Sequence, residues 1–202
     1  MTAIDLFLNY FSRSSVITIF VLAWLSIYFV MTFSILISKS LSLSEWINRE
    51  RASLESIMMG AKNVRDDSLL RKCSSLTAPS VELLNVCKNV AEKNATSGLS
   101  WLSVIASTSP FIGLFGTVVS ILETFSGLGQ SSSASLGVIA PAISEALVAT
   151  AAGIFVAIPA YTFHILLKRK GFEALNLIQR QADILLSNSK KDMNKVTNDQ
   201  LG

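Results

Sequence analysis

The sequence predicts an all-α integral membrane protein with three membrane-spanning helices. Half of the 202 residues are hydrophobic and only 15% are charged, whereas a soluble domain carries about 25% charged residues. The mean hydropathy is +0.51, and no lysine or arginine occurs between residues 94 and 167. This composition argues against a soluble enzyme, a disordered chain and a disulfide-rich secreted domain. The net charge of +3 is too small to indicate nucleic-acid binding.

The first expected span covers residues 16–38, an uncharged run of 23 residues. A helix of that length reaches about 35 Å, which exceeds the roughly 30 Å of a bilayer's hydrocarbon core. No basic segment precedes the run and no small-residue cleavage site follows it, so a retained span is favoured over a signal peptide. Ahead of the run, residues 1–15 place apolar side chains at helical spacing, which predicts an interfacial segment.

Residues 39–100 are polar overall and predict a cytoplasmic helical region. Apolar residues recur there at helical spacing in two stripes. The first stripe consists of Leu43, Trp46, Ile47, Leu54, Ile57, Met58 and Ala61, and the second of Leu83, Val86, Cys87, Val90 and Ala91. The stripes predict helices that pack on each other or on a neighbouring subunit. In a cytoplasmic region Cys73 and Cys87 are expected to be reduced thiols.

The second and third expected spans cover residues 101–128 and 135–167, and residues 129–134 form a short external turn. Three consecutive basic residues follow the third span. Beyond them, residues 168–202 repeat apolar side chains at helical spacing before a polar tail. This pattern predicts that the third span continues as an amphipathic helix.

The basic residues predict the orientation of the spans. Sixteen of the 17 lysines and arginines fall in two blocks, residues 39–93 and residues 168–195. Because basic segments near spans stay on the cytoplasmic side, the N-terminus is expected outside and the C-terminus inside.

Small residues distinguish the second and third spans from a plain lipid anchor. Residues four apart form one small-residue face on each span: Ser109, Gly113 and Thr117 on the second, and Ala149, Gly153 and Ala157 on the third. Such faces let helix backbones approach closely in a membrane, and three spans have little interior of their own, so the faces favour an oligomer. Prolines at or inside the spans require neighbours that satisfy the backbone. They are Pro110, Pro141 and Pro159.

Glu145 is the acidic residue expected deepest in a span. If the third span is centred near Thr150, Glu145 lies about 7–8 Å from the middle of the bilayer. A charged side chain there costs about 2.5–3.5 kcal/mol or more, so it normally faces a helix-bundle interior or a wet cavity. The functional interpretation is a proton or ion site, and the structural alternative is a carboxyl group hydrogen-bonded to a neighbouring helix. Glu123 is expected at the headgroup level.

Two threonines are expected at a similar depth on adjacent helices. Thr117 lies about 3 Å outward of the middle of the second span, and Thr150 lies near the middle of the third. Around an oligomer axis their hydroxyls could form a polar ring, although a lone threonine commonly bonds back to its own helix. His164 has no cluster of metal-ligating residues around it in the sequence, so neither a metal nor a cofactor is expected.

Two ordered segments carry a resemblance to a known family. They are Ser109-Pro-Phe-Ile-Gly-Leu-Phe-Gly-Thr-Val118 and Ala140-Pro-Ala-Ile-Ser-Glu-Ala-Leu-Val-Ala-Thr-Ala-Ala-Gly153, followed by Ala157-Ile-Pro-Ala160. Together they closely resemble the TolQ/ExbB/MotA family of proton-channel subunits. The first segment also contains Gly116, a further small residue expected at a helix contact. The resemblance is strong from residue 101 to about residue 170, while the first span and polar region match in plan only.

The resemblance implies a homopentamer in the bacterial inner membrane, with the second and third spans around a central pore. The pore would hold the helices of a dimeric ExbD/TolR-type single-span partner, and ion flow would drive work on a TonB- or TolA-type protein. The family's pore threonines correspond to Thr117 and Thr150, and its membrane glutamate to Glu145. Glu123 stands where relatives usually have Asn or His.

Two other function classes stay open from the sequence. A non-conducting membrane scaffold that assembles and stabilises a partner would account for the small-residue faces, but it gives Glu145 no role. A membrane enzyme would need a nucleophile–base pair or a metal cluster, and no such pattern occurs. Within the channel interpretation, a Tol-type, a Ton-type or another motor role remains open, as does the choice between protons and sodium ions.

Overall fold

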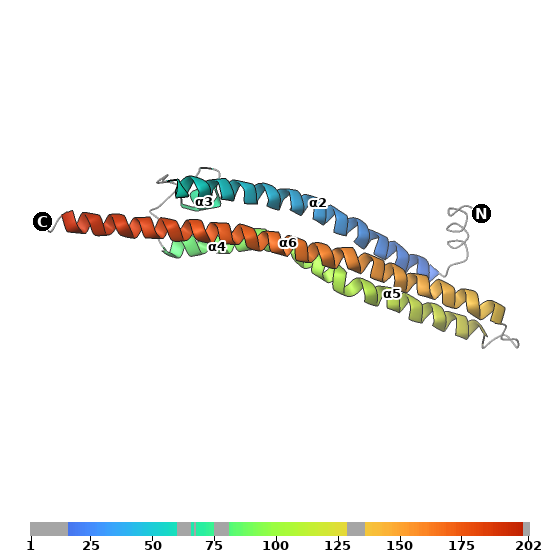
Figure 1. The fold of residues 1–202 in the computed structure, drawn as a ribbon. Helices are drawn as coiled ribbons and strands as arrows, with labels where there is room; N and C mark the ends of the chain where they lie inside the picture. Colours follow the sequence, from blue (N-terminus) through green and yellow to red (C-terminus); the bar gives the residue numbers. More distant parts are fainter. Residues whose placement is uncertain (1–15, 60–65, 67, 75–80, 129–135, 200–202) are drawn as a thin grey trace. The chain divides into compact units, whose positions relative to one another are not determined.

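The computed structural model describes residues 16–59, 66, 68–74, 81–128 and 136–199, and every regular element in these ranges is a helix. In chain order the helices are α2 (Val16–Met58), α3 (Leu69–Ser74), α4 (Val81–Thr96), α5 (Leu99–Leu128) and α6 (Leu136–Asp199) (Figure 1). The expected interfacial segment and the external turn lie outside the described residues.

Three helical stretches are long and apolar enough to cross a membrane. They are Val16–Met58, Val81–Gly127 and Ile139–Asn188. The first contains the whole expected span and the other two contain nearly all of theirs, so the prediction of an all-α membrane protein with three spans is confirmed at this level. Each helix also continues well past its apolar run. In particular, α6 remains helical to Asp199, so most of the polar tail expected after the amphipathic segment is part of the helix.

The chain forms two compact units, and each is built from segments far apart in the sequence. Unit 1 combines Met1–Leu36 with Ser100–His164, and unit 2 combines Ile37–Leu99 with Ile165–Gly202. Gly98 lies just before the last residue of a unit 2 segment and has a φ of 85°, a value that side chains other than glycine rarely adopt. This left-handed residue ends α4 and lets α5 begin at the next residue.

Unit 1 has a core of aliphatic and small side chains from three helices. Its buried members are Val21, Leu25, Ile105, Ala149, Val156 and Ala160. Aromatic pairs extend the contact between α2 and α6: the rings of Phe29 and Phe155 stack at 5.7 Å, and those of Phe33 and Phe163 meet edge-on at 5.5 Å. The outer faces of unit 1 expose large apolar side chains, including Phe20 and Phe111. Such a surface suits lipid or neighbouring helices and not water.

Unit 2 has a separate core, to which all four of its helices contribute. The buried members are Ile57, Leu70, Leu84, Cys87, Ala91, Ile178 and Ala182. The stripe predicted on α2 is mostly buried, but Met58 at its end is exposed, and Ala61 lies outside the described residues.

The stripe predicted on α4 is confirmed in part: Cys87 and Ala91 are buried as expected, but the other predicted positions are not the buried ones. Val86 and Val90 are exposed, whereas Leu84, Cys87, Ala91 and Ala95 are buried. The smaller side chains face inward because α6 approaches closely there: a Cβ added to Gly171 would lie 3.3 Å from the Cβ of Ala95. Close approach therefore selects alanine over valine on this face.

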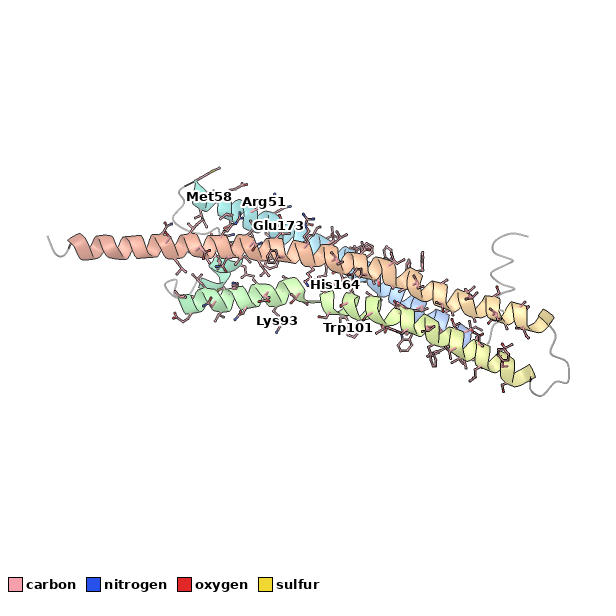
Figure 2. The ribbon with its side chains drawn as sticks, turned by 60° about the horizontal axis from the view of Figure 1, so that its bottom comes forward. Arg51, Met58, Lys93, Trp101, His164 and Glu173 are labelled. Atoms are coloured by element: carbon pink, nitrogen blue, oxygen red, sulfur yellow. The ribbon has the colours of Figure 1, made fainter. Side chains whose placement is uncertain are left out.

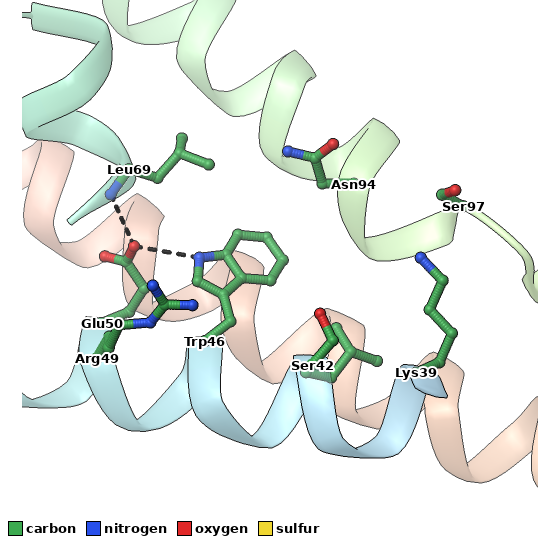
Figure 3. Close-up of a pocket in the computed structure, with 9 residues that line it drawn as sticks. Lys39, Ser42, Trp46, Arg49, Glu50, Leu69, Asn94 and Ser97 are labelled. Atoms are coloured by element: carbon green, nitrogen blue, oxygen red, sulfur yellow. Dashed lines mark hydrogen bonds between the residues drawn. The ribbon is translucent and has the colours of Figure 1, made fainter. Parts of the chain in front are cut away.

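A buried polar cluster ties α2, α3 and α6 together in unit 2. The fully buried carboxylate of Glu50 accepts hydrogen bonds from the Trp46 indole at 3.2 Å and from the Leu69 backbone N–H at 2.9 Å (Figure 3). Its other oxygen accepts from the Ser68 hydroxyl and from Gln181 Nε2, both at 3.0 Å. Gln181 Nε2 also reaches the Glu50 backbone carbonyl at 2.8 Å. We call Trp46, Glu50, Ser68, Leu69 and Gln181 the Glu50 cluster.

At the surface of unit 2, Arg51 of α2 donates to Glu173 of α6 at 2.7 Å (Figure 2). Both side chains are about half exposed, so this ion pair is screened by water and adds little stability. The alignment of α2 with α6 in unit 2 therefore depends mainly on the Glu50 cluster and the apolar core.

Candidate functional site

The small-residue faces of α5 and α6 meet at two glycines in unit 1. A Cβ on Gly113 would lie 2.7 Å from the carbonyl oxygen of Ala149, and one on Gly153 would lie 2.6 Å from that of Ser109. Neither distance is compatible with a side chain. The two backbones are therefore in direct contact, as small-xxx-small faces allow in membranes. We call this contact between α5 and α6 the glycine seam.

The first span joins the seam at Gly116. A Cβ there would lie 3.1 Å from Ala149 Cβ and 3.1 Å from Val21 Cγ1, so all three helices of unit 1 meet at this level. In the sequence the first span is an uncharged, largely apolar run. The structure shows that it buries two hydroxyl side chains, Thr18 and Thr32, against its neighbours.

The two threonines predicted at a similar depth lie in contact beside the glycine seam. The Thr117 hydroxyl is within hydrogen-bond distance of the Thr150 hydroxyl, and it also lies 3.0 Å from the carbonyl oxygen of Ala146. Both hydroxyls lie 3.3 Å from the Gly113 carbonyl oxygen. Each hydroxyl has one proton, so a consistent arrangement is Thr150 donating to Thr117 and Thr117 donating to Ala146. The pair thus links α5 to α6 through side-chain hydrogen bonds.

Glu145 lies on the opposite side of the buried stripe of α6 from Thr150. At about 100° per residue, the five positions between them amount to a rotation of about 140° and a rise of about 7.5 Å. The buried residues Ala146, Ala149 and Gly153 lie between these two directions. Glu145 itself is half-buried and borders the side of α6 on which Phe155 meets Phe29 of α2. Within one protomer, the three predicted pore residues therefore do not share one helix face.

The other predicted residues fall at the edges of these contacts. Pro110 and Pro159 are half-buried inside continuous helices, and Pro141 is exposed near the start of α6. Ala157 is half-buried, while Val156 and Ala160 continue the buried stripe of α6.

Glu123 is exposed on α5 and His164 is half-buried on α6. Across the described ranges, no group of three His, Cys, Asp or Glu side chains could hold a metal ion. The roles of Thr117, Glu145 and Thr150 as pore residues stay predictions.

Sequence reasoning missed polar residues that packing makes conspicuous. No prediction was made for Glu50 or Gln181, yet both are fully buried. Thr18 was absorbed into an apolar run, and Ser120 into the second span. One pattern in the sequence could have identified the buried threonines of the first span. Thr18 and Thr32 lie on the same helix face as Val21 and Leu25, and all four are buried.

Comparison with known proteins gives consistent matches. The profile described as the MotA/TolQ/ExbB proton channel family matches residues 77–180, a range that includes α4, α5 and most of α6. The match therefore contains the glycine seam, both threonines and Glu145.

Full-length relatives extend the match. The chain is 46% identical over 186 residues to ExbB-like 1 of Helicobacter pylori, which covers 91% of this chain and 98% of that protein. It is 29% identical over 189 residues to the Tol-Pal system protein TolQ of Haemophilus influenzae, covering 79% of this chain and 83% of that protein. It is also 42% identical over 94 residues to the biopolymer transport protein ExbB of Salmonella typhimurium, covering 46% of this chain and 38% of that protein.

Proposed function

Because the chain belongs to the MotA/TolQ/ExbB proton channel family, we propose that it is the channel subunit of an ion-driven motor in the bacterial inner membrane. In this proposal a homopentamer surrounds an ExbD/TolR-type single-span dimer, and ion flow drives work on a TonB- or TolA-type envelope protein. The N-terminus lies outside, and the basic blocks of unit 2 lie in the cytoplasm.

The observation that carries the proposal is the hydrogen-bonded threonine pair between two spanning helices, one of which carries Glu145 in its apolar stretch. Thr117 and Thr150 place two hydroxyls inside helices that are otherwise apolar, and Thr117 bonds the carbonyl of the residue that follows Glu145. A simple anchor or a lipid-facing helix gains nothing from polar groups at this depth, where each is costly. An ion pathway needs such groups, because an ion in transit must exchange its water for protein oxygens.

Energetics support a motor. One elementary charge moving through 100 mV releases about 2.3 kcal/mol, so a few ions suffice for a conformational step. The glycine seam is compatible with the helix movements that a motor needs. Where the backbones of α5 and α6 touch directly, few interlocking side chains resist small shifts of one helix along the other.

Ion flux in liposomes tests the proposal. The channel is co-purified with its single-span partner, reconstituted, and exposed to a pH gradient with a membrane potential. Glu145→Gln is expected to lower the proton flux at least about tenfold, which corresponds to about 1.4 kcal/mol on the barrier. Glu123→Gln is the matched control, because it removes an exposed carboxylate on α5, and it should retain the wild-type flux.

A non-conducting scaffold makes the opposite prediction. In that case the wild-type complex gives no flux above that of empty liposomes, and Glu145→Gln leaves the partner's abundance and cellular function intact. The phenotype of a deletion strain distinguishes a Tol-type from a Ton-type role. Detergent sensitivity indicates a Tol-type role, and iron starvation indicates a Ton-type role.

A further inference from the structure

Thr18 of α2 has a buried hydroxyl without a hydrogen-bond partner among the described residues. The residue is 1% exposed, and its Oγ1 makes no hydrogen bond within the part of the chain that the structure describes. Thr32 on the same helix is the useful contrast: it is equally buried, and its hydroxyl donates to the Tyr28 carbonyl at 2.9 Å. A buried polar atom without a partner is unusual and calls for an explanation such as a bound ion or water.

The contact at Gly116 fixes the relative heights of the three helices of unit 1. Val21 of α2, Gly116 of α5 and Ala149 of α6 meet at this contact. One helical turn further toward the outer ends of these helices, α2 has Thr18, α5 has Ser120 and α6 has Glu145. Ser120 is buried, at 6% exposed.

Three contacts give similar heights for α2 and α5 relative to α6. The stacked pair Phe29 and Phe155 aligns α2 with α6 so that Thr18 is level with residue 144, while the Gly116 contact gives residue 146. The bond from Thr117 to the Ala146 carbonyl aligns Ser120, three residues further on, with residue 143. All three estimates agree within one turn. A polar residue from each helix of unit 1 therefore lies in a single layer around residue 145.

We infer that Thr18 and Ser120 form, with Glu145, a cation-binding layer on the outer side of the glycine seam. The inference rests on the proposed channel function. The donor set is all oxygen, from two hydroxyls and one carboxylate, and it suits a hard monovalent cation such as hydronium or Na⁺. In the proposed orientation an ion entering from outside reaches this layer before the threonine pair. The missing partner of Thr18 is then the ion or its accompanying water.

The main test is Thr18→Val, which replaces the hydroxyl by a methyl group of similar size. In liposomes containing the complex with its partner, we expect the flux to fall about tenfold under a pH gradient, a Na⁺ gradient, or both. The gradient that is affected identifies the cation. Thr18→Ser retains a hydroxyl and should restore flux to within about twofold of wild type, and Ser120→Ala should lower it.

Thermal unfolding of the same samples distinguishes ion binding from a structural role. Because the Thr18 hydroxyl bonds no group within the described ranges, its removal should leave the midpoint of thermal unfolding unchanged or raise it. Thr32→Val is the matched control: it removes a satisfied hydroxyl on the same helix, so it should lower the midpoint and keep wild-type flux.

Each outcome decides the inference. A Thr18→Val complex that keeps full flux under both gradients overturns it, as does one that loses flux only in proportion to a lowered midpoint. If Glu145→Gln blocks flux and Thr18→Val does not, this inference fails while the proposed function stands. If Glu145→Gln also conducts normally, the proposed function itself fails.

Discussion

The main buried polar groups of the two units, the Glu50 carboxylate and the unit 1 hydroxyls, differ in how they are hydrogen-bonded. In unit 2, the Glu50 carboxylate accepts four side-chain and backbone hydrogen bonds from three helical segments. In unit 1, the Thr117 and Thr150 hydroxyls share acceptors with each other, and the Thr18 hydroxyl has none among the described residues. Unit 2 satisfies the Glu50 carboxylate with its own groups, although Arg49 Nε there is buried without a hydrogen-bond partner among the described residues, and unit 1 leaves the Thr18 hydroxyl unsatisfied in the same sense.

The difference indicates what each group is for. A fully hydrogen-bonded buried network fixes one arrangement of the backbone, since breaking any member leaves others without partners. Unused capacity costs stability, and a protein retains it where something else supplies the partner. We therefore interpret the Glu50 cluster as a structural lock and the unit 1 hydroxyls as part of an ion pathway. The following predictions test that division, from the largest expected effect to the smallest.

Glu50→Ala should cause the largest loss of stability. It removes the carboxylate that accepts from Trp46, Ser68 and Leu69, at about 1–3 kcal/mol for each donor before relaxation, and we expect a net loss of about 4 kcal/mol. Chemical unfolding of the purified oligomer measures it. Glu45→Ala, which removes a 73% exposed carboxylate from the same helix, should change stability by less than about 0.5 kcal/mol. A similar loss from both variants would contradict the structural role of Glu50.

Gly113→Ala should destabilise the glycine seam by about 2–3 kcal/mol. Its new Cβ would meet the Ala149 carbonyl oxygen at 2.7 Å, so the two helices must separate. Gly127→Ala is the control, because nothing lies within 4 Å of a Cβ there, and alanine improves helix propensity. Size-exclusion chromatography and thermal unfolding report the effect. Equal midpoints for the two variants would show that the close contact is absent from the native oligomer.

Thr150→Val should cost about 1 kcal/mol, the net value of a neutral hydrogen bond. Its effect on ion flux should be much larger than this stability loss suggests, because the hydroxyl is proposed to contact the ion. Thr162→Val serves as the control, since Thr162 is exposed and bonds only within its own helix, to the Ile158 carbonyl at 2.9 Å. If both variants conduct equally well, Thr150 belongs with the structural group.

Arg51→Gln should have the smallest effect, about 0.5 kcal/mol or less. The ion pair with Glu173 is short, but both side chains are about half exposed. Raising the salt concentration should reduce the wild-type stability toward that of the variant. A loss above about 1.5 kcal/mol that does not respond to salt would show that this pair, together with the Glu50 cluster, locks unit 2.

Much of the fold was accessible from the sequence because the membrane imposes simple rules. An uncharged run of span length, small residues four apart and a carboxylate in an apolar stretch each have few interpretations. Depth arithmetic was sufficient to place Thr117 level with Thr150, because a helix rises uniformly.

The missed features depend on which side of a helix faces a neighbour, and periodicity alone does not settle that. On α4 the stripes beginning at Leu83 and Leu84 differ by one residue, and the approach of Gly171 to Ala95 decides between them. Glu50 looks like a surface carboxylate until Gln181, which is 131 residues away, reaches it. Thr18 is noticeable only because its buried hydroxyl has no hydrogen-bond partner in the part of the chain that the structure describes.

The division of unit 2 into two distant segments has a consequence for biosynthesis. Glu50 leaves the ribosome 131 residues before Gln181, which at 5–20 residues per second is an interval of roughly 7–26 s. During that time two further spans must enter the bilayer before Ile178 and Ala182 can complete the core. The donors of Trp46, Ser68 and Leu69 are encoded close to Glu50, so they are available to hold the carboxylate while the nascent chain waits. Closure of unit 2 therefore depends on synthesis of the last segment of the chain.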